Sequence, residues 1–139
     1  MPDWLQPVRN LIHMPADSIK TKRIYEKPEA NDGFRILVDR LWPRGLKKER
    51  AAIDLWLKEI APSNDLRKWF GHEKPRWEDF RKRYGDELAG KADLLASLSN
   101  LVKEKGKVTL LFAASDEAHN NAVALKEFIE SGSPLGHTG

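Results

Sequence analysis

The residues best suited to chemistry come directly after a short apolar run, in the segment Asp39-Arg40-Leu41-Trp42-Pro43-Arg44-Gly45. Arg40 and Arg44 each offer a planar, permanently charged guanidinium that matches the geometry of a carboxylate or a phosphate. Trp42 lies between them and could stack on a flat ligand or on an arginine. The segment therefore predicts an anion-binding loop with Arg40, Trp42 and Arg44 as ligand-binding residues.

Three residues of the same segment are expected to shape this loop. Pro43 and Gly45 break a strand and favour a tight turn, and Asp39 lies at the point where the apolar run ends. We assign these three a structural or orienting role. The competing interpretation is that Asp39 pairs with an arginine across a sheet while the tryptophan of the loop fills a gap in the core.

A second polar segment, Ser115-Asp116-Glu117-Ala118-His119-Asn120, follows another apolar run. Asp116 and His119 are three residues apart, so both can lie on one face of a helix. Such a pair can orient a general base or supply two metal ligands. Because a metal would need a third ligand, we predict no metal site. The competing interpretation is a capping aspartate beside a hydrogen-bonded histidine.

The middle of the chain adds polar residues between aromatic ones, and Arg67 and His72 could point into the same cleft. The full set of candidates then falls into two groups. The catalytic candidates are Asp116, His119 and His72, and the ligand-binding candidates are Arg40, Trp42, Arg44, Arg67, Asn120 and Ser63.

Composition limits the chemistry that these residues can perform. The chain has 139 residues with 40% hydrophobic and 32% charged residues, which is typical of one globular domain. It has no cysteine, which excludes a thiolate nucleophile, a disulfide framework and cysteine-ligated metal sites. No window resembles a membrane span or a secretory signal, so we expect a cytoplasmic protein without a membrane partner. The sequence identifies no cofactor and no oligomeric state.

Charge is unevenly distributed along the chain. The formal net charge is +3, yet residues 20–50 contain ten basic and five acidic residues. A basic segment of this kind can attract phosphate, nucleic acid or an anionic small molecule. A nucleic-acid-binding module that uses residues 20–50 is therefore an alternative function, although the interleaved acids dilute its field.

Two nearly continuous apolar runs predict buried strands over Phe34–Leu41 and Val108–Ala114, and a further strand is expected over Thr21–Tyr25. Helices are expected from Ser63 as N-cap to Phe70, from Pro75 toward Leu88, through the leucines that precede Gly106, and from about Asp116 onward. Residues 52–60 fit either a helix or a strand, and we favour a helix.

Strands that alternate with helices predict an α/β sandwich of two or three layers, with a short, partly parallel sheet. In such sheets, ligands bind outside the carboxyl ends of the strands. The two polar segments follow two predicted strands, so we expect them to meet there. The P-loop, the dinucleotide fingerprint and the nucleophile elbow are absent from the sequence.

The polar segments also carry a resemblance to a known family. The motifs that carry it are Asp32-Gly33 with Arg35, Leu37-Val38-Asp39-Arg40-Leu41-Trp42-Pro43-Arg44-Gly45, Ala61-Pro62-Ser63, Leu66-Arg67 with Phe70 and His72, and Val108-Thr109-Leu110-Leu111 with Ala113-Ala114, Asp116 and His119-Asn120. Through them the chain resembles the YeaO-like proteins, a bacterial and archaeal family of unknown function. The resemblance covers about residues 20–130. It implies a single small α/β domain and supplies no reaction.

The domain organisation expected from these observations is an N-terminal extension over 1–19, an α/β domain over 20–131 and a flexible tail over 132–139. The leading functional prediction is a cleft that binds an anionic ligand, phosphate-bearing or nucleotide-like, with hydrolysis or group transfer as the chemistry its catalytic candidates could serve. A third alternative is a non-catalytic structural or interaction protein, in which Asp39, Arg40 and Asp116 form buried ion pairs and no cleft exists.

Overall fold

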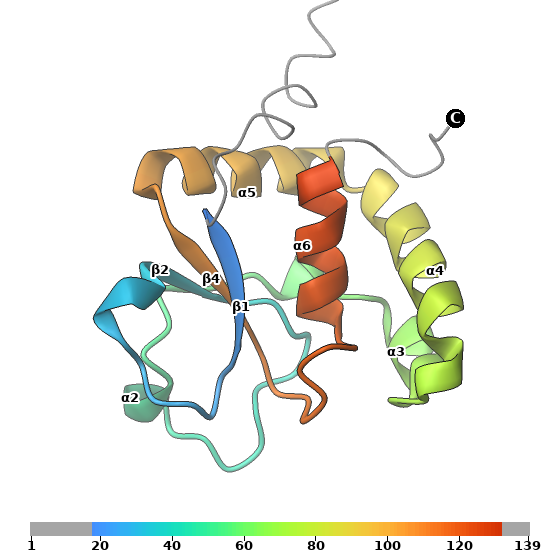
Figure 1. Cartoon of the computed structure of the whole chain (residues 1–139), viewed down its shortest axis with the longest axis horizontal. Helices are drawn as coiled ribbons and strands as arrows, with labels where there is room; N and C mark the ends of the chain where they lie inside the picture. The colour runs from blue at the N-terminus through green and yellow to red at the C-terminus, as the bar shows by residue number, and fades with distance from the viewer. Residues whose placement is uncertain (1–17, 132–139) are drawn as a thin grey trace, which may run out of the picture.

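The fold is a small α/β domain, seen in a computed structural model that describes residues 18–131 (Figure 1). The expected extension, apart from Ser18 and Ile19, and the expected tail lie outside the described residues. Four strands form one sheet in the order β1-β4-β2-β3. Their bounds are β1 Ile19–Arg23, β2 Phe34–Leu37, β3 Leu55–Trp56 and β4 Val108–Phe112.

All neighbouring strands of this sheet run parallel, with Ile36 of β2 beside Leu110 of β4 and Ile19 of β1 beside Val108. The α/β class and the parallel pairing predicted from the apolar runs are confirmed, and the sheet is parallel throughout. All five residues of β4 are buried because β4 lies between β1 and β2. Parallel strands place their carboxyl ends at one edge of the sheet, and that edge carries both polar segments.

Side chains alternate between the two faces of the sheet, as the pleat requires. Ile36, Val38 and Leu110 belong to the larger core cluster. Leu37 and Leu111 point the other way, into a smaller cluster that also contains Trp42 and Trp56. The larger cluster includes residues from the helices that lie between residues 64 and 131, so these helices cover one face. The short helix at residues 48–51 and the surrounding loops cover the other.

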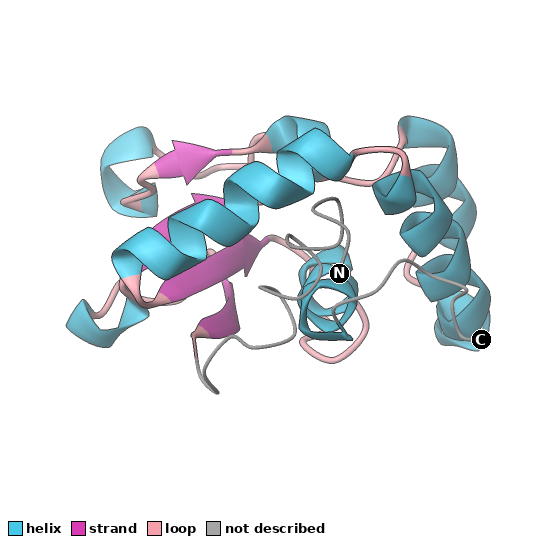
Figure 2. Ribbon diagram, turned by 90° about the horizontal axis from the view of Figure 1, so that it is seen from above, coloured by secondary structure: helices cyan, strands magenta, loops and turns pink. Residues whose placement is uncertain are grey.

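Helices flank the strands in both views of the molecule (Figure 1 and Figure 2). The α-helices are α2 Lys48–Ala51, α3 Asn64–Phe70, α4 Trp77–Ala89, α5 Ala92–Lys105 and α6 Asn121–Ser131. Short 3-10 turns are η2 Ala30–Asp32, η3 Lys58–Ile60 and η4 Lys74–Arg76.

Several helix ends follow their predicted signals. The Ser63 side chain accepts a hydrogen bond from the Leu66 N–H at the start of α3. Pro75 lies in η4, which leads directly into α4, and Gly106 ends α5 at φ 79°. These residues satisfy backbone groups or adopt dihedrals that helix ends require.

The helix favoured for residues 52–60 is wrong. Ala52 takes a left-handed conformation that ends α2, and the short elements β3 and η3 follow it with irregular residues between them. The Asp54 N–H donates to the Arg35 carbonyl and the Leu57 N–H donates to the Leu37 carbonyl. Pairing with the edge of the sheet therefore overrides the helical spacing of the apolar residues.

The last helix begins later than predicted, at Asn121 and not near Asp116. The Asp116 carboxylate accepts hydrogen bonds from the Ala118 and His119 N–H groups, which closes a turn before the helix. The Asn120 side chain then accepts from the Val123 N–H and caps α6. The predicted strands are likewise shorter or shifted: β2 ends at Leu37, and β1 covers Ile19–Arg23.

A buried ion cluster lies at the opposite, amino-terminal edge of the sheet. Asp32 is 0% exposed and sits 2.9 Å from Lys20 Nζ and 3.1 Å from Lys22 Nζ. Its carboxylate also pairs with Arg35, and its carbonyl accepts a 2.6 Å hydrogen bond from the Thr109 hydroxyl. The cluster therefore connects β1, β4 and β2 at the edge away from the two polar segments.

Candidate functional site

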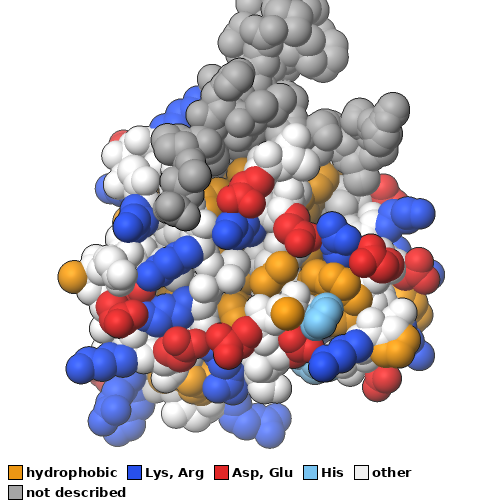
Figure 3. Space-filling model, in the orientation of Figure 1, with side chains coloured by type: hydrophobic (Ala, Val, Ile, Leu, Met, Phe, Trp, Pro, Cys, Tyr) orange, Lys and Arg blue, Asp and Glu red, His pale blue; other side chains and the backbone are white. Residues whose placement is uncertain are grey.

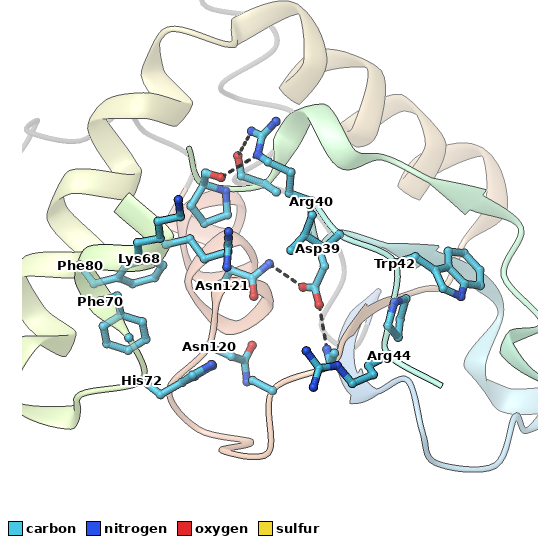
Figure 4. A pocket seen from close by; sticks show the side chains of 18 of the residues that line it. Asp39, Arg40, Trp42, Arg44, Lys68, Phe70, His72, Phe80, Asn120 and Asn121 are labelled. Carbon is cyan, nitrogen blue, oxygen red and sulfur yellow. Dashed lines mark hydrogen bonds between the residues drawn. The ribbon is translucent and has the colours of Figure 1, made fainter. Parts of the chain in front are cut away.

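A pocket of about 540 Å³ opens at the carboxyl ends of β2 and β4 (Figure 4). Its polar lining residues include Asp39, Arg40, Arg44, Arg67, Lys68, His72, Asn120 and Asn121. Its apolar lining residues include Pro43, Pro62, Phe70, Phe80, Ala113 and Ala114. The cleft predicted between the two polar segments is thus present, and the carboxyl end of α3 adds a third side to it.

Asp39 occupies the inner part of this pocket, where β2 ends. Its Oδ2 accepts a 2.9 Å hydrogen bond from the Ala113 N–H, and its Oδ1 accepts a 3.1 Å hydrogen bond from the Asn121 side chain. Burial raises the pKa of this carboxyl. The two hydrogen bonds, and the electrostatic attraction of the nearby His72 and Arg67, oppose this rise only in part. Asp39 therefore joins the ends of the two strands and forms no ion pair within residues 18–131.

Arg40 holds the loop that precedes α3. Its Nε donates to the Pro62 carbonyl and its Nη2 to the Ala61 carbonyl, both at 3.1 Å. Lys91 Nζ donates to the same Ala61 carbonyl. Arg40 thus lines the pocket as predicted, but two of its five N–H donors are directed at the backbone, which gives it a positioning role.

The mouth of the pocket is cationic. Arg44 follows β2, Arg67 and Lys68 come from α3, and all three are exposed. His72 follows Gly71, the C-cap of α3, and is exposed with φ 61°. A left-handed backbone at a residue other than glycine costs about 1–2 kcal/mol, and such strain is concentrated at functional sites. In Figure 4 the His72 ring points toward Asn120, across the opening.

Trp42 lines the pocket but is also committed to packing. Its indole N–H donates a 2.7 Å hydrogen bond to the Leu46 carbonyl, and its ring meets Trp56 edge-on at 5.4 Å. Leu46 and Ile53 lie in the same smaller core cluster. Trp42 therefore packs against the smaller core cluster and also lines the pocket, and its stacking on a ligand stays a prediction.

Asp116 and His119 form the expected pair but do not line the pocket. His119 Nδ1 lies 3.0 Å from Asp116 Oδ2, and the imidazole meets Trp77 edge-on at 5.2 Å. Burial would raise the pKa of Asp116, but hydrogen bonds from Ala118 and His119 outweigh it and hold that pKa below its usual value. The pair is built by a turn and not by one helical face.

Of the remaining predicted residues, some line the pocket and others only shape the structure around it. Asn120 is buried, lines the pocket and donates to the Asp116 carbonyl, so it links the pocket to the Asp–His pair. Ser63 does not line the pocket, because its hydroxyl donates to Glu87 at 2.6 Å and caps α3. Pro43 is a buried lining residue, and Gly45 has φ 73° in the loop beside it.

Three lining residues with polar side chains were not predicted: Tyr25, Lys68 and Asn121. Asn121 donates to both the Val38 carbonyl and the Asp39 carboxylate, and its place beside Asn120 after an apolar strand is a signal that could have revealed it. Lys68 is adjacent to the predicted Arg67. Tyr25, whose hydroxyl donates to the Arg44 carbonyl, carries no comparable sequence signal.

Residues 18–131 contain no group of three or more metal-ligating side chains placed to hold an ion. Within the same range, none of the helices has the length and apolar character needed to cross a membrane.

The fold and the pocket define a small parallel α/β protein with a cationic pocket at the carboxyl edge of its sheet. Residues 18–133 match the family model described as "Inactive DUF488-N3 subclade". The chain therefore belongs to the DUF488 family, within its YeaO-like group, and the resemblance stated from the sequence is confirmed.

Curated relatives support this assignment. The uncharacterized protein YeaO of Escherichia coli (strain K12) is 44% identical over 114 residues, which are 82% of this chain and 98% of that protein. Uncharacterized proteins of Mycobacterium tuberculosis and Mycobacterium bovis are each 35% identical over 113 residues, covering 80% of this chain and 92% of theirs. No solved structure matches the chain.

The structure also bears on the two alternative functions. Lys22 and Arg35, counted in the basic segment, are buried against Asp32, and acidic and basic side chains are interspersed over the face in Figure 3. The charge that segment 20–50 offers a nucleic acid is therefore smaller than its sequence indicates. The ion pairs expected for a closed structural protein are not formed by Asp39 or Arg40 within residues 18–131.

Proposed function

We propose that this protein binds a phosphate-bearing small molecule in the pocket at the carboxyl ends of β2 and β4. One observation carries the proposal: five basic residues line the pocket against a single carboxylate, Asp39, among the described lining residues. The basic side chains at the mouth come from two separate segments: Arg44 follows β2, and Arg67, Lys68 and His72 lie on or directly after α3. An anion between them would meet charge from several sides, which is the arrangement that favours phosphate.

The site is suited to binding more than to turnover. The Asp116–His119 pair, the best candidate for proton transfer in the sequence, lies outside the lining of the pocket. The matching family model is described as inactive. We therefore propose recognition of the ligand as the main role, with hydrolysis or group transfer as a secondary candidate that would have to use His72.

The double substitution Arg67→Gln/Lys68→Gln tests this proposal. Both residues are exposed on α3, and glutamine is as good a helix former as arginine or lysine, so the fold should survive. In calorimetric titrations with a panel of phosphate monoesters, at least one should bind the wild type, and the double variant should bind it at least tenfold more weakly. The reason is the loss of two charges that face the anion.

The matched control is Lys82→Gln/Lys103→Gln, which removes two exposed charges from α4 and α5 outside the pocket. It should leave the affinity within about twofold of the wild type. An equal loss in both double variants would show that only the overall charge matters. That result, or the failure of every phosphate ester to bind the wild type, would overturn the proposal.

A further inference from the structure

The pocket is larger than a phosphate needs and is divided electrostatically. Its volume of about 540 Å³ lies in the range of cavities that hold organic ligands of drug size, about 300–1,000 Å³. Arg44, Arg67 and Lys68 line the pocket with exposed side chains at its mouth. Asp39 lies inside, between Asn121 and the end of β4 (Figure 4). A bare anion would use the mouth and leave the inner part empty.

Asp39 retains capacity to accept hydrogen bonds from a ligand. Each oxygen of an ionised carboxylate can accept about two hydrogen bonds, and within residues 18–131 each oxygen of Asp39 accepts one. The carboxylate is partly exposed and lines the pocket. Its two protein donors hold it in a fixed orientation, which lowers the entropic cost of binding a ligand there.

The same carboxylate acts against some ligands. A phosphate placed next to Asp39 would be repelled, and the repulsion is strong where water is partly excluded. A group that donates hydrogen bonds would instead be attracted, since a carboxylate is a strong acceptor. The pocket therefore selects a molecule with an anionic end and a neutral, donor-rich body, by attraction at one end and by repulsion at the other.

We propose that the ligand is a phosphorylated sugar, whose phosphate lies between Arg44, Arg67 and Lys68 and whose hydroxyl groups donate to Asp39. This inference rests on the proposed function and names the class of ligand for the same pocket. The apolar walls, formed in part by Pro43, Phe70 and Phe80, would contact the carbon skeleton of the sugar.

Calorimetric titration of the wild-type protein with ribose 5-phosphate, pentyl phosphate and inorganic phosphate tests the inference. Pentyl phosphate keeps the charge and chain length of the sugar ester but lacks its hydroxyl groups. Ribose 5-phosphate should bind at least tenfold more tightly than either of the other two. Adenosine 5′-monophosphate carries the same ribose phosphate. Tighter binding than ribose 5-phosphate would identify a nucleotide as the source of this chemistry, and weaker binding a free sugar phosphate.

The substitution Asp39→Asn tests the residue itself. It should abolish the preference for ribose 5-phosphate over pentyl phosphate and leave inorganic phosphate bound at least as tightly as by the wild type. If the variant does not fold, the comparison of the three ligands on the wild-type protein still tests the inference.

Equal affinity for ribose 5-phosphate and pentyl phosphate would overturn the inference but not the proposed anion site. An unchanged preference for ribose 5-phosphate in a folded Asp39→Asn variant would do the same. Failure of all these phosphates to bind would overturn both.

Discussion

Replacing Asp32 by alanine is expected to lower the free energy of unfolding by about 3–5 kcal/mol, the usual cost of removing one partner from a buried ion pair. Lys22 and Arg35 are 8% and 4% exposed, and both direct their charge at the Asp32 carboxylate. Without it, Arg35 would lose the carboxylate that it pairs with, and Lys22 would keep only the exposed carboxylate of Glu29. The penalty comes from these unpaired charges more than from the lost attraction.

Urea denaturation of the wild type and the variant, followed by circular dichroism, measures this effect. Glu29→Gln is the matched control, because Glu29 also pairs with Lys22 but its side chain is 61% exposed. It should cost far less, since exposed ion pairs contribute little. Similar losses in both variants would show that burial of the cluster is not what makes Asp32 important.

Acid should remove the same stabilisation in the wild type. Burial alone would raise the pKa of Asp32, but hydrogen bonds from the Glu29 N–H, Lys20, Lys22 and Arg35 outweigh it and hold the pKa well below its usual range. A carboxyl whose pKa is lowered on folding stabilises the protein above its unfolded pKa of about 3.9 and loses that contribution as the pH falls further. Wild-type stability should therefore drop more steeply below about pH 4 than that of Asp32→Ala.

The sequence predicted the parts of the fold that depend on local pattern. The apolar runs of β2 and β4 indicate strands buried on both faces, and Ser63 and Gly106 mark helix ends through groups within a few residues of them. The segment around Leu55 and Trp56 behaves differently. Its apolar spacing fits a helix, and what makes it a strand is pairing with Ile36 and Leu37, about twenty residues earlier in the chain.

The site shows the same division between local and distant causes. The rule that ligands lie at the carboxyl ends of parallel strands placed the pocket correctly after β2 and β4. This rule does not show which groups a side chain forms hydrogen bonds with. Arg40 reaches the carbonyls of Ala61 and Pro62, which only the folded chain brings near it. Asp39, expected to orient the loop, is the pocket's inner carboxylate because Ala113 and Asn121 meet it there.

Gly33→Ala is expected to destabilise the protein by about 3 kcal/mol or more. Gly33 lies between Asp32 and β2 with φ 67° and ψ −139°, a conformation that only glycine adopts readily. A Cβ at this position would overlap the backbone carbonyl of Lys107. The same carbonyl accepts the 3.0 Å hydrogen bond from the Phe34 N–H where β2 meets β4. Backbone dihedral strain and steric displacement of a strand therefore add together.

Gly45→Ala is a reference without the steric cost, because Gly45 has a comparable φ of 73° but no atom within 4 Å of the added Cβ. It should lose only the dihedral part, about 1–2 kcal/mol. Thermal and urea unfolding of both variants measure the difference, which comes from the close approach to Lys107 together with the ψ of −139° at Gly33. Equal losses would mean that β2 shifts freely away from β4. In that case the start of β2 would not be held against its neighbour, and the geometry of the Asp32 cluster would not depend on Gly33.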